Sequence, residues 1–354
     1  MATYKGIQGY TIQSLASDPP GAQSVGQIWY NSTSNVWKVG SSSPGAWASA
    51  PSLTTARSAT TAYGTTTASI CISGNTPGPT PGGTNYTPTT EEYDGTSWTQ
   101  GGTVTTYGTQ EAMGTGTATA GLWFGGYEGN TDGGGIKLTC EEYDGTSWTA
   151  VNPITEKRKA GAAAGSVTAA LLFAGQDGFV PGGPGSVMQS NVQEYNGTSW
   201  TNVNNIDTQM SQCGGSMAGT QTAAVRALGA LTGHGAPQAA SNTVSDYDGT
   251  CWTAGTAANT ARPDLGFVGI QTSAIVMGGW LPPGSPLFAI TEQWNGTAWT
   301  EVADLGTGRA ICSGAGASVT SGLCVAGRTP PSTPTNNVEE WSSPAFVTQT
   351  VTTS

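Results

Sequence analysis

Residues able to perform acid–base or nucleophilic chemistry are scarce in this chain of 354 residues. It has one histidine, His234, within Thr232-Gly233-His234-Gly235, which the glycines predict to be a loop. One histidine is too few for a multi-histidine zinc or copper site and leaves little room for a Ser-His-Asp set. No Gly-x-Ser-x-Gly elbow is present. We therefore expect no catalytic residue, no metal site, no cofactor and no enzymatic activity.

Carboxylates and arginines recur at regular places. Glycoside hydrolysis needs two carboxylates about 5–10 Å apart, but the glutamates here are copied along the chain as Glu91, Glu92, Glu141, Glu142, Glu194, Glu292, Glu339 and Glu340. An arginine follows ten residues after a tryptophan at Arg57, Arg158, Arg262 and Arg309, while Gly108 and Met210 take that place twice. We expect these groups to form ion pairs of the Glu142–Arg158 type across adjacent strands or sheets.

The six cysteines, at 71, 140, 213, 251, 312 and 324, show no metal-binding spacing. Their default role is that of small buried apolar residues. Cys312 and Cys324 fall on adjacent predicted strands of the last repeat, and whether they pair stays open.

The element that organises the chain is a nine-residue stretch. Glu91–Thr99 returns letter for letter at Glu141–Thr149, and edited copies follow. Each copy holds two aromatic residues five positions apart: Tyr93 and Trp98, Tyr143 and Trp148, Tyr195 and Trp200, Tyr247 and Trp252, Trp294 and Trp299, and Trp341 and Phe346. The Asp-Gly or Asn-Gly between them predicts a β-hairpin with a type I′ turn. A feature present in every repeat is best explained by burial between neighbouring sheets, so these aromatic residues are predicted to be structural.

Each repeat has a second landmark, an apolar strand that ends in a small residue and glycine, as in Leu122–Gly126. A loop of variable length follows, and all of these loops should emerge on one rim. They carry candidate ligand or partner residues: Tyr86, Tyr127, Phe179, His234, Trp280 and Phe288. Loops on a rigid scaffold are common recognition sites, although plain connection is the alternative.

The glycine turn, the tyrosine, the tryptophan about six residues later and the upstream arginine together resemble the kelch repeat. Kelch repeats form four-stranded blades, so the resemblance implies an all-β, six-bladed, kelch-like β-propeller over residues 46–354. A spacing of 47 to 52 residues between tryptophans supports this, because one short sheet cannot bury both of its faces alone. Either the strand around Trp47 or the final strand, Ala345–Thr350, would close the ring.

Residues 1–45 lack the repeat and are predicted to form an anchor segment with a hairpin over Gly26–Val39. That hairpin resembles short modules of bacteriophage tail and fibre proteins, which implies a non-enzymatic virion structural protein, assembled in the host cytoplasm and incorporated into the phage particle. Its partners would be other virion proteins, bound through the N-terminal segment, and a homo-oligomer is left open. The alternative is a carbohydrate- or receptor-binding adhesin that contacts a host-surface glycan or receptor; a propeller-type glycan hydrolase ranks third.

The composition argues against two partner classes. The net charge is −11 with only 11 Lys and Arg residues, so no basic stripe is available for nucleic acid. No apolar run reaches the roughly 20 residues that a membrane-spanning helix needs. We expect neither nucleic-acid binding nor membrane insertion.

Overall fold

The computed structural model describes residues 13–19, 25–78, 84–129, 135–178, 187–215, 217–232, 239–281, 287–330 and 333–351. Every regular element in these ranges is a β-strand, and none of the described segments is a helix long and apolar enough to cross a bilayer. The chain divides into two compact units. The terminal unit combines Met1–Ala46 with Ser343–Ser354, and the propeller unit comprises Trp47–Ser342.

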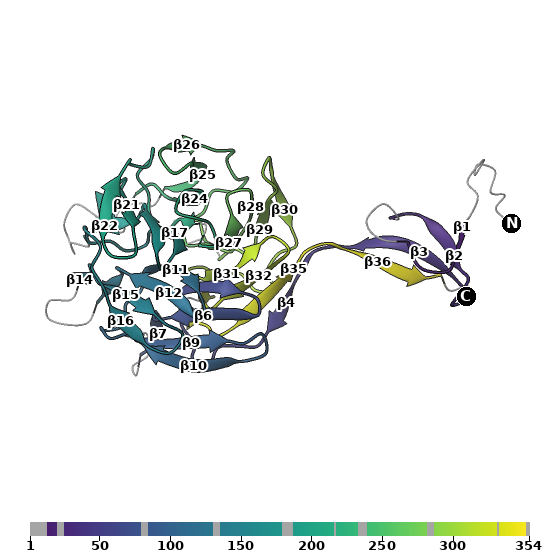
Figure 1. Ribbon diagram of the computed structural model, residues 1–354, viewed down its shortest axis with the longest axis horizontal. Helices are drawn as coiled ribbons and strands as arrows, with labels where there is room; N and C mark the ends of the chain where they lie inside the picture. Colours follow the sequence, from purple (N-terminus) through teal and green to yellow (C-terminus); the bar gives the residue numbers. More distant parts are fainter. Residues whose placement is uncertain are drawn as a thin grey trace. The chain divides into compact units, whose positions relative to one another are not determined.

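The terminal unit contains one four-stranded sheet (Figure 1), ordered β1 (Gln13–Leu15), β2 (Ile28–Asn31), β3 (Val36–Ser43) and β36 (Ala345–Thr350). Strands β2 and β3 form a hairpin with Trp29 opposite Lys38. Strand β36 runs antiparallel to β3. Assigning the last twelve residues to the propeller is therefore wrong, because β36 finds its hydrogen-bond partner in the terminal sheet. Phe346 lies opposite Ser42 and is not the hairpin partner of Trp341.

The described part of the propeller unit contains six four-stranded sheets, numbered here in chain order (Figure 1). Sheets 1 to 3 are β5 (Thr61–Thr65), β6 (Ala68–Ile72), β9 (Thr89–Tyr93) and β10 (Trp98–Thr103); β11 (Met113–Thr117), β12 (Ala120–Phe124), β15 (Cys140–Tyr143) and β16 (Trp148–Ala150); and β17 (Ala162–Ser166), β18 (Ala169–Phe173), β21 (Val192–Tyr195) and β22 (Trp200–Val203). Sheets 4 to 6 are β23 (Gly214–Gly215), β24 (Ala224–Ala230), β25 (Ala240–Tyr247) and β26 (Trp252–Ala254); β27 (Gly266–Ile270), β28 (Ser273–Met277), β29 (Thr291–Trp294) and β30 (Trp299–Val302); and β31 (Ser313–Ser318), β32 (Ser321–Val325), β35 (Val338–Ser342) and β4 (Ala46–Ala50).

These sheets close into a ring. The first strand named for each sheet is the innermost; it contacts the innermost strand of the next sheet, and β31 contacts β5. The ring closes through β4, which is the outer strand of sheet 6. The Trp47 ring lies 5.6 Å from that of Trp341, and its Nε1 donates to Thr291 Oγ1 at 3.0 Å. Of the two closures left open by the sequence, the structure has the N-terminal one.

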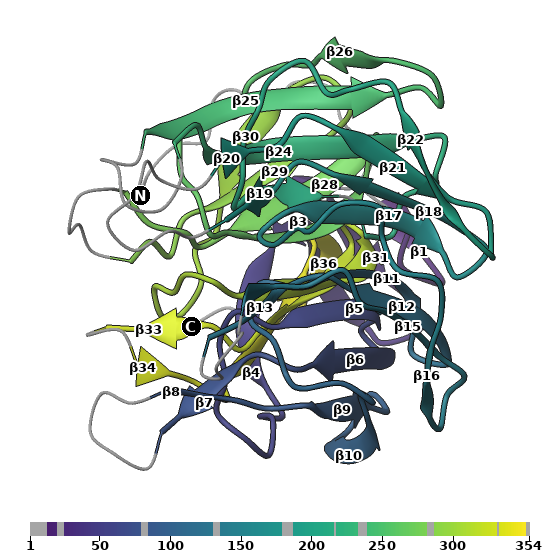
Figure 2. The same ribbon diagram turned by 90° about the vertical axis from the view of Figure 1, so that its left-hand side faces the viewer.

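Two-stranded ribbons leave the sheets where the variable loops were predicted. They are β7 (Asn75–Pro77) with β8 (Thr84–Tyr86), β13 (Tyr127–Glu128) with β14 (Gly135–Ile136), β19 (Gln176–Asp177) with β20 (Val187–Met188), and β33 (Arg328–Thr329) with β34 (Thr333–Pro334). Figure 2 shows them together on one side of the propeller. The variable segments therefore share one rim.

The repeated signature forms a hairpin, but not through a type I′ turn. Tyr93 lies opposite Trp98, and their rings stack with centroids 5.0 Å apart. Gly95 has a φ of 90°, whereas Asp94 does not adopt a positive φ. The Asp94 Oδ1 atom instead accepts hydrogen bonds from the Thr96 and Ser97 amides at 2.7 and 2.8 Å. The aspartate shapes the turn with its side chain, which explains why asparagine serves equally well.

The signature aromatic residues are buried between sheets. Eleven of the twelve predicted structural residues, all except Phe346, are at most 8% exposed. Phe124 of sheet 2 packs against Trp200 of sheet 3 with centroids 4.9 Å apart, and Phe173 of sheet 3 packs against Trp252 of sheet 4 at the same distance. Each sheet thus buries its face against the next, as a propeller requires.

Candidate functional site

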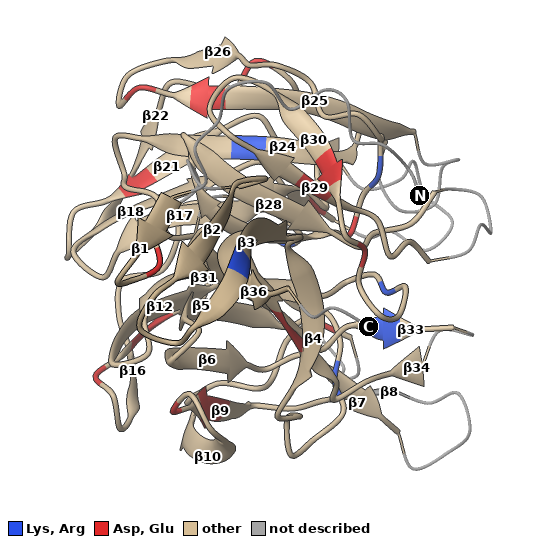
Figure 3. Ribbon diagram, turned by 90° about the vertical axis from the view of Figure 1, so that its right-hand side faces the viewer, with Lys and Arg blue, Asp and Glu red and all other residues tan. Residues whose placement is uncertain are grey.

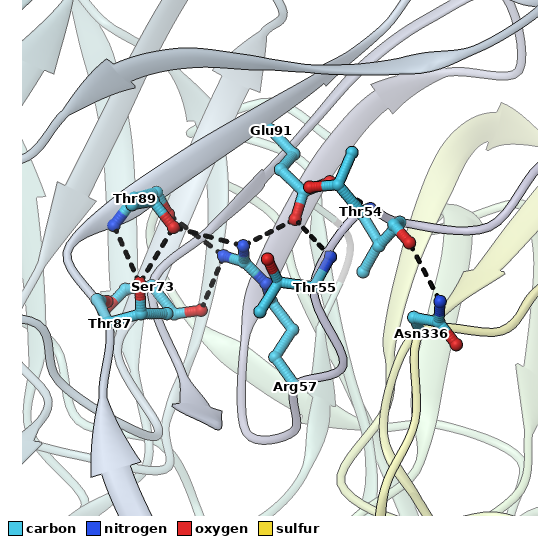
Figure 4. Close-up of polar contacts among 9 residues, drawn as sticks. Thr54, Thr55, Arg57, Ser73, Thr87, Thr89, Glu91 and Asn336 are labelled. Atoms are coloured by element: carbon cyan, nitrogen blue, oxygen red, sulfur yellow. Dashed lines mark hydrogen bonds and ion pairs between the residues drawn. The ribbon is translucent and has the colours of Figure 1, made fainter. Parts of the chain in front are cut away.

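The repeated arginines serve the fold. In sheet 1, Arg57 is fully buried; its Nη1 donates to the carbonyl oxygens of Ser73 and Thr89 at 3.2 and 3.0 Å, and its Nη2 to Glu91 at 2.6 Å (Figure 4). Ser73 has a φ of 57° because the chain turns sharply there. The guanidinium therefore gives the Ser73 carbonyl a donor at the turn and ties this turn to the Thr89 carbonyl of β9. The same buried ion pair recurs between Arg262 and Glu292 at 2.6 Å and between Arg309 and Glu339.

The expected Glu142–Arg158 pair is wrong. The carboxylates that pair with arginine occupy the first of the two acidic positions and belong to the same sheet as their arginine, whereas sheet 3 has Gln193 there. Arg158 instead donates to the Asn191 carbonyl at 2.7 Å, and burial lowers its pKa to about 10. Glu142 accepts from the Tyr195 hydroxyl at 3.0 Å, which joins sheet 2 to sheet 3.

Two sheets lack the arginine and fill its place differently. In sheet 4, Arg226 reaches from β24 to Met210 Sδ at 2.7 Å and Ser245 Oγ at 2.5 Å. In sheet 2 the residue at the arginine position is Thr109, and not Gly108 as the spacing predicted. Glu111 and Ala59 occupy equivalent places, since the Glu111 amide donates to the Ala59 carbonyl, and Ala59 follows Arg57 by two residues as Glu111 follows Thr109. Trp123 there lies opposite Glu141, as Arg226 lies opposite Ser245. A bulky residue on the second strand thus accompanies each missing arginine.

The centre of the propeller is an axial ring of backbone hydrogen bonds. Its members come one from each sheet or its approach: Ala59, Glu111, Ala160, Gln212, Asp264 and Ile311, with φ between 53° and 59°. Each amide donates to the carbonyl of the preceding member, and the Ala59 amide donates to Ile311, at 2.7 to 3.1 Å. Left-handed backbone costs about 1–3 kcal/mol at a non-glycine residue. The closed ring offsets this cost by satisfying six amides on the axis.

The axial ring places unlike side chains where the sheets converge. The side-chain amide of Gln212 and the indole of Trp280 both donate to Asp264 Oδ2, at 3.0 and 2.7 Å. Lys159, only 3% exposed, contacts Glu111 Oε2 at 2.7 Å, and its Nζ lies 5.2 Å from the centroid of the Tyr127 ring. We call these six residues the axial cluster: Tyr127, Glu111, Lys159, Gln212, Asp264 and Trp280.

Asp264 is the perturbed acid of the axial cluster. Burial, with a smaller contribution from the charge of Glu111, raises its pKa to about 7, against the opposing effects of the Trp280 hydrogen bond, Arg328 and Lys159. A cavity of about 90 Å³ lies beside it on the axis, lined by axial-ring residues and inner strands. A buried acid that titrates near neutrality beside a cavity is a functional-site candidate. The arrangement can bind a small polar group and can exchange one proton at Asp264.

Metal binding has little support in the resolved geometry. Among the described residues no group of three or more His, Cys, Asp or Glu side chains is placed to hold a metal ion. All six cysteines are free thiols. Cys312 and Cys324 lie close enough for their thiols to share a hydrogen bond. This bond lowers the pKa of Cys312 and raises that of Cys324.

The structure brings only some of the predicted loop residues together. Tyr127 and Trp280 belong to the axial cluster, while Tyr86 lines a groove beside Tyr107 and shares the surroundings of Gly129 with Tyr127. Tyr86, Tyr127, Trp280 and Phe288 are half-buried. Phe179 and His234 lie outside the described residues. The sequence prediction missed Glu111, Lys159, Gln212 and Asp264, which follow the arginine position by one or two residues.

Comparisons with known proteins support the fold and leave the activity open. No family model matches the chain, and no curated protein matches it. The solved structure of YjhT, a β-propeller-type fold, matches with a TM-score of 0.66 and 10% identity, over 84% of this chain and 99% of YjhT. The protein is an all-β propeller. That prediction is confirmed, and at this identity the likeness extends to the fold alone.

Proposed function

We propose that the protein is a non-enzymatic structural and attachment protein of a virion, of the kind found in bacteriophage tails, fibres or capsids. The observation that carries this proposal is the terminal sheet. The chain leaves it after β3, builds the whole propeller, and returns to pair β36 with β3. A propeller inserted between two adjacent strands of one small sheet is held by two chain connections, which suits a displayed module on an anchor.

The terminal sheet also presents an apolar face. Ile28 and Tyr30 alternate along β2 and share that face with Trp37, which lies opposite Tyr30. Ile28 is 54% and Trp37 43% exposed, and the Tyr30 and Trp37 rings meet at 5.5 Å. Trp29, on the other face, is 2% exposed and donates to Asp18 at 3.0 Å. An aromatic face left in water on a sheet whose other face is satisfied favours docking of another virion protein.

The propeller itself supports binding better than catalysis. Lys159 neutralises Glu111, and Asp264 receives two hydrogen bonds on one oxygen, so both axial carboxylates are committed within the cluster. Charged residues are sparse and dispersed over the described strands (Figure 3). We infer that the repeat is a kelch variant in which the arginine and the two left-handed residues of the glycine turn, as Arg57 with Ser73 and Gly74, form one structural cluster. Release of sugar from a panel of polysaccharides by the purified chain would contradict the non-enzymatic proposal.

The test of anchoring is incorporation into particles of the virus that encodes the chain. The full chain carrying Ile28→Ser and Trp37→Ser is expected to fold, as judged by an unchanged melting temperature, and to be depleted from gradient-purified particles. Val187→Ser is the matched control, because Val187 is 60% exposed on a propeller ribbon; it should be incorporated normally. Absence of the wild-type chain from particles, or full incorporation of the double variant, would refute the anchor role.

A further inference from the structure

One repeat of the propeller contains an insertion. In five repeats the arginine position follows a buried apolar residue by four places, as from Leu53 to Arg57 or from Ile154 to Arg158. In the second repeat the interval from Val104 to Thr109 is five. The extra residue lies within Thr105–Gly108. The other five repeats form the same four-stranded sheet without this residue, so the fold does not require it.

The insertion presents Tyr107 to solvent. This side chain is 73% exposed, the highest value among the exposed large apolar residues of the described chain. The loop around it is nevertheless fixed. Glu141, fully buried, accepts hydrogen bonds from the amides of Thr105 and Thr106 at 2.7 and 3.1 Å and from the Thr106 hydroxyl at 2.7 Å. A Cβ on Gly108 would lie 2.3 Å from the Thr87 carbonyl, so the backbone packs tightly there.

An exposed tyrosine on a fixed backbone is suited to binding. Tyrosine supplies a large contact area while ordering only two side-chain torsions, so a ligand loses little free energy in fixing it. The cost of holding the loop is already met within the free protein by Glu141. Tyr107 therefore has the features of a preorganised contact residue.

Tyr107 lines an open groove of about 700 Å³. Asn85, Tyr86 and Pro88 from the first repeat also line it, and Glu128 contributes from the β13–β14 ribbon. This volume falls within the range of small-ligand sites. The groove and the axial cavity share no lining residue, although Tyr86 of the groove and Tyr127 of the axial cluster both lie beside Gly129.

We infer that this groove binds a neutral pyranose sugar of a surface glycan. Tyr86 and Tyr107 both line the groove, and an aromatic ring can pack against the apolar C–H face of a sugar ring, while the Asn85 amide and Glu128 carboxylate are hydrogen-bonding groups for its hydroxyls. Glu128 is 4% exposed and paired with Lys137 at 2.5 Å, which holds it in place and offsets its charge. No described residue lining the groove is Lys or Arg, and the chain carries a net charge of −11, so an anionic sugar is disfavoured. The inference deepens the attachment role proposed above and rests on it.

The experiment uses the full chain on an array of neutral, sialylated and sulfated glycans, followed by titration of the neutral glycans that bind. Tyr107→Ala should weaken binding about tenfold or more, as for a central aromatic contact. Tyr107→Phe should retain most of the affinity because it keeps the ring. Val187→Ala, at an exposed residue of a different ribbon, is the control and should bind as the wild type does.

Three results would overturn the inference: no neutral glycan bound at millimolar concentration, binding confined to anionic glycans, or undiminished binding by Tyr107→Ala. Particle incorporation separates this failure from failure of the proposed function. Tyr107→Ala should enter particles at the wild-type level while losing glycan binding. Loss of incorporation instead would place Tyr107 in an assembly contact and remove the glycan site.

Discussion

Replacing Asp264 with asparagine should stabilise the propeller at neutral pH and leave its stability almost unchanged in acid. The carboxyl has a pKa raised from 3.8 to about 7 in the folded chain. Between these values the unfolded chain has released the proton and the folded chain retains it, so the stability of the wild type falls as pH rises. Asparagine keeps an oxygen that accepts from Gln212 and Trp280 and carries no charge to bury. The difference in unfolding free energy between variant and wild type should therefore grow with pH.

The magnitude follows from linkage. Integrating between pH 5 and pH 8 with these two pKa values gives a wild-type loss of about 3 kcal/mol, most of it below pH 7. Urea unfolding of Asp264→Asn and wild type at pH 5, 6, 7 and 8 measures this difference directly. Glu301→Gln, at an exposed carboxylate, is the control and should give a difference that does not change with pH. A constant offset for Asp264→Asn across the range would refute the reasoning, because it would mean that Asp264 titrates normally.

Two further predictions concern the repeat. Arg262→Met should cost about 3–5 kcal/mol in urea unfolding, because it leaves the carboxylate of Glu292 buried without its cation. Adding Glu292→Gln should recover part of the loss, because it removes the charge and keeps an oxygen for the Asn259 and Thr260 amides. A cost below about 1 kcal/mol for the single variant would contradict a buried ion pair. Gly279→Ala should cost on the order of 1–3 kcal/mol, since Gly279 has a φ of 97° and a Cβ would lie 2.8 Å from a backbone carbonyl. Gly135→Ala, where a Cβ would have no neighbour within 4 Å, should be nearly neutral in the same assay.

The repeat was enough to predict the propeller because each copy predicts the same local structure. Trp98 and its equivalents fix the period, and a period near 50 residues cannot form independent domains. The ends were harder, because single strands carry little information about their partners. Ala345–Thr350 reads as a strand in either sheet, and only its pairing with β3 shows where it belongs. The turn type was misassigned because Asp-Gly also supports a loop in which the aspartate side chain bonds two amides.

The glycine turn of the fourth repeat shows a similar limit. An apolar strand that ends in a small residue and glycine would place this turn at Thr232-Gly233. The left-handed pair in the structure is Leu228 and Gly229, with φ of 55° and 126°. A leucine in that conformation is rare, so local preference pointed to a later glycine. The neighbouring contacts decide instead: a Cβ on Gly229 would lie 2.7 Å from the Ser211 carbonyl. Tertiary packing selected a position that residue preference alone disfavours.

The arginine network could have been predicted more fully from the sequence. Across the six second strands, the residue opposite the first acidic position is Cys71, Trp123, Leu172, Arg226, Val276 and Cys324. The two largest of these, Trp123 and Arg226, occur in the two repeats without the arginine. A compensating exchange of volume was therefore visible within the chain. What the sequence did not contain was the direction in which Glu142 points, because alternate residues of a strand face opposite sides and the register of that strand was unknown.

Departures from the repeat locate the functional candidates better than residue type does. A side chain present in five of the six copies, such as the signature tryptophan, is explained by burial between sheets. The axial ring, by contrast, repeats its backbone conformation six times and varies its side chains from alanine to aspartate, so the fold requires the conformation and leaves the side chains free. The loop that carries Tyr107 also departs from the repeat in length, because it has one residue more than the other copies. The fold does not require the added residue or a large exposed side chain in this loop, so the exposure of Tyr107 calls for another explanation. The proposed glycan site supplies one, and the Tyr107→Ala variant tests it.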